Sequence, residues 1–186
     1  MLSGPFFLRK AAVAVPLAVA ALIALFGSES WAASPYWPTT FLELMKTLFP
    51  AIAAHAKKSA FPATTELYMG LSLLLLPLYT WYSYQEMTTP TAQAWYRNLW
   101  TLRSAWAAAR RMALVLLILG IVLSTLFAPV AYDRNFMPYH SSRGALAAFG
   151  WIFAGGAQGG LLAWVACNLV LVTRFIRRRR EAARRR

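Results

Sequence analysis

The chain has 186 residues, and its 19 lysines and arginines against 6 aspartates and glutamates give it a formal net charge of +13. Hydrophobic residues make up 59% of the chain and charged residues 13%, whereas soluble globular domains average roughly 45–50% and 25%. This composition excludes an ordinary soluble enzyme domain and a disordered basic protein. The single cysteine also excludes an intramolecular disulfide.

Four apolar stretches predict membrane-spanning helices, each of which needs about 20 mostly apolar residues. Backbone polar groups in lipid must pair within helices or closed barrels, and the sequence lacks the alternation of barrel strands. We therefore predict an all-α fold, an integral membrane bundle of four transmembrane helices that forms a single domain over residues 1–186. The predicted spans cover residues 11–26, 67–84, 112–130 and 145–175.

The first apolar stretch allows two interpretations. Arg9 and Lys10 precede a short apolar run, and residues 30–32 form a small-x-small site, which together are typical of a secretory signal peptide. Cleavage after Ala32 would leave three transmembrane helices. A retained helix would be kinked at Pro16, which neighbouring helices in a bundle tolerate.

The distribution of basic residues predicts the orientation of the helices, because cytoplasmic loops of membrane proteins are enriched in lysine and arginine. With both termini inside, most basic residues fall in the inside loop over residues 85–111 and in the basic tail over residues 174–186. The loop over residues 27–66 is then outside. We therefore expect a multi-pass protein of a bacterial inner membrane with cytoplasmic N- and C-termini.

Two segments between the spans have the periodicity of amphipathic helices. In the outside loop, an apolar stripe predicts an interfacial helix on the membrane or on the bundle, or else a helix that binds in a partner's groove. In the inside loop, Thr91 is a candidate cap for a helix that continues into the third span. The two stripes consist of Phe41, Leu44, Met45, Leu48, Phe49 and Ile52, and of Trp95, Leu99, Leu102 and Trp106.

The fourth span contains two overlapping GxxxG pairs, Gly155 with Gly159 and Gly156 with Gly160. Small residues four positions apart form a flat helix face on which another backbone packs closely. We predict a helix-packing surface here, either within the bundle or toward another subunit. Ala163 and Cys167 continue the small-residue seam, and Gln158 and Asn168 are expected to form interhelical hydrogen bonds.

The loop between the third and fourth spans combines aromatic, basic and acidic residues, which is the composition of a protein interface. Its serines and histidine have no spacing that marks a catalytic triad, which is recognised by geometry. We predict that the loop docks an extracytoplasmic partner. The residues of this predicted docking loop are Asp133, Arg134, Phe136, Tyr139, His140 and Arg143.

The C-terminal tail predicts binding to anionic lipids, whose headgroups attract juxtamembrane arginines. No aromatic residues interleave its last arginines, so the tail does not predict a nucleic-acid-binding surface. The arginines in question are Arg174, Arg177, Arg178, Arg179, Arg180, Arg184, Arg185 and Arg186.

The sequence predicts no catalytic residue, no metal site and no cofactor. The spans contain no Asp, Glu, Lys, Arg or His at membrane depth, which argues against a proton-coupled transporter. His55 and His140 fall in outside loops, where they cannot ligate a haem within the bundle, and no ligand spacing marks a metal site. We expect both histidines to face solvent or lipid headgroups.

We expect a non-enzymatic small subunit of a bacterial inner-membrane assembly of the secretion, conjugation or envelope type. It would act by helix packing and loop docking, with membrane lipids and other subunits as partners. One alternative is a homo-oligomeric channel or transporter protomer, with Ser72, Thr80, Ser124 and Thr125 as candidate lining hydroxyls. Further alternatives are a small enzyme acting on lipid or quinone through Asp133, His140 and Arg143, and a membrane exclusion or immunity protein.

Overall fold

The computed structural model describes residues 4–32, 39–95, 102, 104–128 and 141–184. All regular secondary structure in these ranges is helical, so the predicted all-α fold is confirmed. The helices are α1 (Gly4–Phe26), α2 (Glu29–Ala32), α3 (Thr39–Leu48), α4 (Ala51–Lys58), α5 (Pro62–Leu74), α6 (Leu76–Met87), α7 (Pro90–Trp95), α8 (Ala105–Phe127), α9 (Arg143–Trp151), the π-helical segment η2 (Ile152–Gly156) and α10 (Ala157–Arg184).

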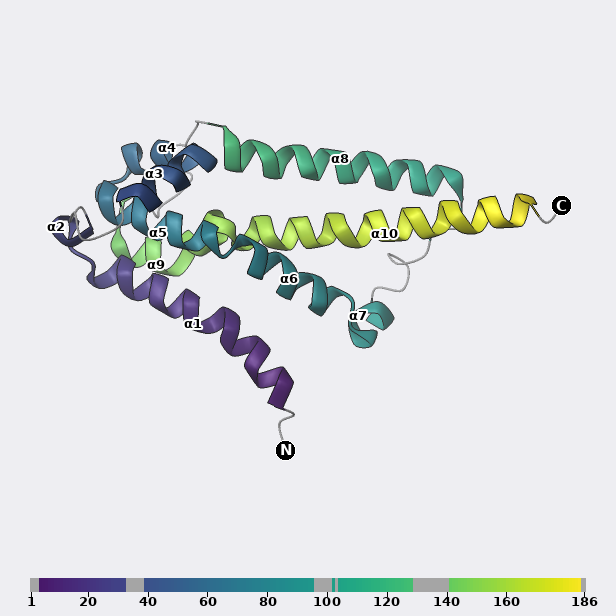
Figure 1. The fold of residues 1–186 in the computed structure, drawn as a ribbon, viewed down its shortest axis with the longest axis horizontal. Coiled ribbons are helices and arrows are strands. Elements are labelled where there is room, and N and C mark those ends of the chain that lie inside the picture. The colour runs from purple at the N-terminus through teal and green to yellow at the C-terminus, as the bar shows by residue number, and fades with distance from the viewer. Residues whose placement is uncertain (1–3, 33–38, 96–101, 103, 129–140, 185–186) are drawn as a thin grey trace.

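Four helical runs alternate in direction through the molecule (Figure 1). Helices α1 and α8 run toward the end at which α2, α3 and α4 lie, and the runs α5–α6 and α9–α10 lead away from it. We call this end the core end. The opposite end, which holds α7, the start of α8 and the C-terminal part of α10, is the tail end. Helix α10 packs along both α6 and α8.

Two described helical runs are long and apolar enough to cross a membrane by length and composition. One is α8, and the other is the run from α9 through α10. The apolar part of α1, Val13–Phe26, is shorter, and the predicted span over residues 67–84 is divided between α5 and α6. The helix lengths thus agree with two of the four predicted spans, and the four-span bundle remains a prediction.

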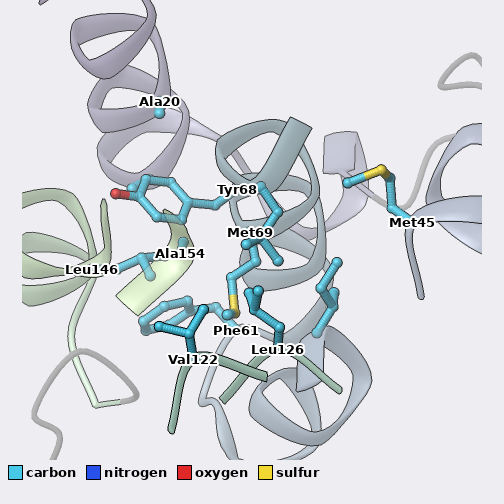
Figure 2. Packing of buried hydrophobic residues seen from close by; sticks show 12 residues of the cluster. Ala20, Met45, Phe61, Tyr68, Met69, Val122, Leu126, Leu146 and Ala154 are labelled. Atoms are coloured by element: carbon cyan, nitrogen blue, oxygen red, sulfur yellow. The ribbon is translucent and has the colours of Figure 1, made fainter. Parts of the chain in front are cut away.

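A buried apolar cluster joins the helices at the core end (Figure 2). Tyr68 of α5, Leu146 of α9 and Val122 of α8 all belong to this cluster, and all three side chains are at most 1% exposed. The rings of Phe49 and Phe127 contact one another at 5.8 Å between centroids, which connects the α3–α4 turn to the end of α8. The cluster therefore fixes segments far apart in the sequence at one end of the molecule.

The amphipathic stripe in the outside loop is divided between two helices rather than carried by one. Pro50 has no N–H to continue the hydrogen-bond ladder, so α3 ends at Leu48 and α4 begins at Ala51. Met45 and Ile52 of the stripe are buried, while Leu44 and Leu48 are exposed.

The helix predicted from Thr91 into the third span also differs from the structure. Thr89 caps α7, because its hydroxyl accepts a hydrogen bond from the Ala92 N–H at 3.2 Å. The prediction of Thr91 as the cap is wrong, because Pro90 already occupies the first helical position. Ser104 caps α8 in the same way by accepting from Ala107 at 3.1 Å. Leu99 of the predicted stripe lies outside the described residues.

Candidate functional site

Two helix breaks lie within the apolar part of the chain. Helix α5 stops before Leu75, whose φ of −85° and ψ of 0° are not helical. The cause is Pro77, which cannot donate a hydrogen bond to the carbonyl of Leu73, and the ladder resumes when the Tyr79 N–H donates to the Leu75 carbonyl at 2.9 Å. The second break is η2, in which Gly155 has a φ of +120° that residues with a Cβ rarely adopt.

The two breaks face each other. A Cβ on Gly155 would lie 3.2 Å from the carbonyl oxygen of Ser72 and 3.4 Å from the Tyr79 ring. The Gly155 N–H donates to Oε1 of Gln158 at 3.1 Å, so this buried amide satisfies a backbone group freed by the break. The bend of one helical run therefore fits directly against the bend of the other.

Two buried hydroxyls lie at this junction without a hydrogen-bond partner among the described residues. They are Ser72 Oγ and the Tyr79 hydroxyl, on either side of the break between α5 and α6. Tyr68 lies beside Ser72, yet no contact reaches hydrogen-bond geometry at the Ser72 hydroxyl. An unpaired buried polar group costs about 1–3 kcal/mol, and π-helical interruptions of α-helices frequently occur at functional sites.

Of the other hydroxyls predicted as pore-lining candidates, all bond within their own helices. Thr80 donates to the Leu76 carbonyl, Ser124 to Ile121 and Thr125 to Val122, each at 2.8 Å. These three hydroxyls are therefore already satisfied, which separates them from Ser72.

The predicted glycine seam does not form one continuous helix face. Gly155 lies in η2 and precedes α10, so the prediction of a helical Gly155–Gly159 pair is wrong. Glycine adopts the positive φ at the break at little cost, and the Gln158 side chain accepts the hydrogen bond of the Gly155 N–H. Both effects favour an unwound backbone there over a straight helix. The Trp151 ring fills the space beside Gly156.

The remaining small residues of α10 divide between a packed and an open side. A Cβ on Gly159 would lie 2.7 Å from Tyr79 Cβ and 3.0 Å from the Thr80 backbone nitrogen, so α6 and α10 cross at this glycine. Ala163 and Cys167 are buried along the same helix. At Gly160, by contrast, no described atom lies within 4 Å of an added Cβ.

Asn168 connects α10 to α8. Its Oδ1 accepts a hydrogen bond from Arg111 Nη1 at 2.9 Å, and its Nδ2 donates to the Trp164 carbonyl at 2.7 Å. The sequence did not identify Arg111 as the partner, because the two residues are 57 positions apart.

A network of polar contacts connects distant segments of the chain at the core end. The Glu29 carboxylate accepts hydrogen bonds from the backbone N–H groups of Ala63 at 2.9 Å and Thr64 at 3.1 Å, and from the Thr64 hydroxyl at 2.5 Å. These N–H groups belong to the first turn of α5, which has no side-chain cap of its own. Glu29 thus acts as a carboxylate cap from a distant segment, at the end of the helix where a negative charge is stabilising.

Arg143 completes this network. Its guanidinium donates to the Gly27 carbonyl, lies 3.9 Å from the Glu29 carboxylate and stacks over the Phe61 ring at 5.6 Å. Arg143 was predicted to dock a partner, but these contacts connect it within its own chain. The other residues of the predicted docking loop, Asp133, Arg134, Phe136, Tyr139 and His140, lie outside the described residues.

A second ionic group connects α3 to α5. Lys46 Nζ lies 2.7 Å from a Glu43 oxygen and 3.3 Å from a Glu66 oxygen. The hydrogen bond that Lys46 donates to the Glu43 carboxylate, together with the nearby charge of Glu66, raises the pKa of Lys46 above its usual value of 10.5. His55 of α4 is only 3% exposed, so the expectation that it faces solvent or headgroups is wrong. The reason is that α4 packs closely against α5.

The described arginines in the C-terminal part of α10 are exposed. Arg177 pairs with Glu181 one turn along the same helix at 2.9 Å, and Arg179 lies over the Phe175 ring at 5.2 Å. Arg174, Arg178, Arg180 and Arg184 also project from α10, whereas Arg185 and Arg186 lie outside the described residues.

In the part of the chain that the structure describes, no three His, Cys, Asp or Glu side chains gather closely enough to hold a metal ion. The chain matches no protein-family model, and neither curated protein sequences nor solved structures give a significant match. A functional assignment therefore has to rest on the geometry of the chain itself.

Proposed function

We propose that this chain is a four-span subunit of a bacterial inner-membrane assembly, with both termini in the cytoplasm. It binds partner helices within the membrane and performs no catalysis. The alternating direction of the four helical runs supports this topology, and it puts the start of α8 and the C-terminal part of α10 on one side of the molecule. That side carries the arginines, as the positive-inside rule requires.

The observation that carries the proposal is the incomplete packing of the helices. Among the described elements, α8 packs along α10 and touches α4, and α1 packs against α5, α6 and α9. Leu116 and Leu117 of α8 are 62% and 60% exposed, and Val15 of α1 is 60% exposed. A closed four-helix bundle would cover each helix from two sides, so the faces of α1 and α8 are available to other helices.

Two glycines with open space beside them, one on α8 and one on α10, favour a helical partner over lipid alone. No described atom lies within 4 Å of a Cβ added to Gly120 of α8 or to Gly160 of α10. In membranes, helices associate through close backbone approach at small residues, because apolar area alone gives no advantage over lipid. Gly120 and Gly160 provide such positions without being needed for packing inside the chain.

The test is native mass spectrometry of the protein extracted from its own membrane in mild detergent. We expect a heteromeric complex with wild-type protein and with Gly144→Leu, a matched control at another open position. Gly120→Leu and Gly160→Leu should release the partner while leaving the chain helical by circular dichroism. Recovery of the wild-type chain alone would contradict the proposal.

The two facing helix breaks favour a second function, that of a homo-oligomeric channel or transporter protomer. Interrupted helices with unsatisfied polar groups line the sites of many transporters. On this alternative, the same mass spectrum shows a homo-oligomer, and liposomes containing the protein pass solute. Ser72→Ala and Tyr79→Phe should change that flux while preserving the oligomer, because they remove the two unpaired hydroxyls.

A further inference from the structure

A cavity of about 620 Å³ lies at the tail end, between the end of α6, α7 and the C-terminal half of α10. Its walls are fixed by contacts within the chain. Gln93 Nε2 donates to the Thr88 carbonyl at 3.0 Å and holds α7 against the end of α6, which itself packs along α10. The lining residues are Tyr84, Gln85, Thr88, Gln93, Leu102, Cys167, Val170, Leu171, Arg174, Phe175 and Arg178.

The charge of this cavity is positive and uncompensated. Arg174 and Arg178 are four positions apart and therefore share one face of α10. No carboxylate is among the described lining residues, and no ion pair of the described chain includes either arginine. Their neighbour Arg177 is already paired with Glu181. The two lining arginines thus add positive charge to the wall of this cavity without an ion-pair partner there.

The other lining groups divide into a polar wall and an apolar floor. The wall consists of side chains from the end of α6 and from α7, including Gln85 and Gln93, which can donate hydrogen bonds. The floor consists of Cys167, Val170 and Leu171 of α10, where the helix leaves its apolar stretch. A ligand that fits both parts has an anionic group next to an apolar body.

We propose that this cavity binds the phosphate of an anionic phospholipid, with the two arginines on the phosphate oxygens and the upper part of an acyl chain on the apolar floor. The inference rests on the proposed topology, which puts the tail end at the cytoplasmic surface of the membrane. Basic pockets between helices at that surface are suited to lipid headgroups, and the cavity has the volume of a ligand site. A free phosphate would share the arginine contacts but would leave the floor unused.

The experiment compares two variants that remove the same charge from the full chain. The cavity variant carries both Arg174→Gln and Arg178→Gln and so removes the two arginines that line the cavity. The control variant carries both Arg179→Gln and Arg184→Gln and removes two arginines that do not line it. Each protein is reconstituted in vesicles of phosphatidylethanolamine and phosphatidylglycerol in equal amounts, and the retained lipid is measured by native mass spectrometry. We expect the cavity variant to retain phosphatidylglycerol about tenfold more weakly than wild type, and the control within about twofold.

A third variant separates the shape of the cavity from its charge. Val170→Trp fills the floor and keeps every arginine, so it should reduce phosphatidylglycerol retention as the cavity variant does. Equal loss in the two charge variants would mean that the tail attracts lipid only through its overall charge, and would overturn the proposal. Full retention of phosphatidylglycerol by Val170→Trp would also overturn the proposal.

Competition with inorganic phosphate distinguishes a phospholipid from a free phosphate as the ligand of the cavity. We expect phosphate alone to leave the bound phosphatidylglycerol in place, and displacement at concentrations comparable to the lipid would overturn the lipid assignment. Lipid retention does not depend on a protein partner. A chain that is recovered without partners but retains phosphatidylglycerol therefore refutes the proposed subunit function alone.

Discussion

The core end and the tail end of the molecule use their charged side chains differently. At the core end, Glu29, Lys46 and Arg143 each contact groups from a distant part of the sequence. In the C-terminal part of α10, at the tail end, Arg177 and Arg179 contact only their own helix, and Arg174 and Arg178 border a cavity. The charged side chains of this basic protein therefore fall into two groups. One group holds the fold together, and the other is available to a ligand.

The largest effect should come from Glu29, because its carboxylate satisfies three donors at the start of α5. We expect Glu29→Ala to lower the free energy of unfolding by about 2 kcal/mol, since Thr64 is fully buried and loses its acceptor. Glu181→Ala at the tail end breaks only an exposed pair within one helix and should cost about 0.4 kcal/mol. Reversible unfolding in mixed micelles measures both, and equal losses would remove the distinction between the two ends.

The next effect distinguishes the packed side of α10 from its open side. Gly159→Ala places a methyl group against Tyr79 and the α6 backbone and should destabilise the fold by about 1.5 kcal/mol. Gly160→Ala introduces the same methyl group into open space and should stabilise the helix by up to about 0.5 kcal/mol. The melting temperatures of the two variants should therefore shift in opposite directions, and a shift in the same direction would contradict the crossing of α6 and α10 at Gly159.

A smaller effect is expected where α8 meets α10. Arg111→Leu removes the hydrogen bond to Asn168 and leaves a buried amide oxygen unpaired, at a cost of about 1 kcal/mol. Arg110→Leu removes the same charge from an exposed position and serves as the matched control. If the two variants unfold alike, the contact between α8 and α10 does not depend on this hydrogen bond.

The smallest effect concerns Lys46 and depends on pH. Lys46→Met should cost about 0.5 kcal/mol, because the ion pairs with Glu43 and Glu66 are partly exposed to solvent. Since the folded protein holds the pKa of Lys46 above 10.5, this contribution is complete below that pH and is lost as the pH rises through the raised pKa. The difference between wild type and variant should be constant from pH 7 to pH 9, and a difference that falls within this range would contradict the assignment.

Part of the candidate site could be read from the sequence and part could not. Pro77 inside a predicted span is a local signal for a helix break, and the four glycines from Gly155 to Gly160 mark a special backbone in the fourth span. That the two breaks meet, with Ser72 and Tyr79 between them, has no local signal. It depends on how α5 and α6 cross η2 and α10.

Hydropathy and helical periodicity are local properties, and by themselves they determined that the described elements of this chain are helical and that its charges are segregated from its apolar stretches. Charge pairing is not local, because it depends on which segments meet. Arg143 and Gly27 are 116 positions apart, and only their meeting at the core end turned a predicted docking residue into an internal contact. The tail arginines that the structure describes have no such distant partner, and tertiary structure alone placed two of them at the edge of a cavity.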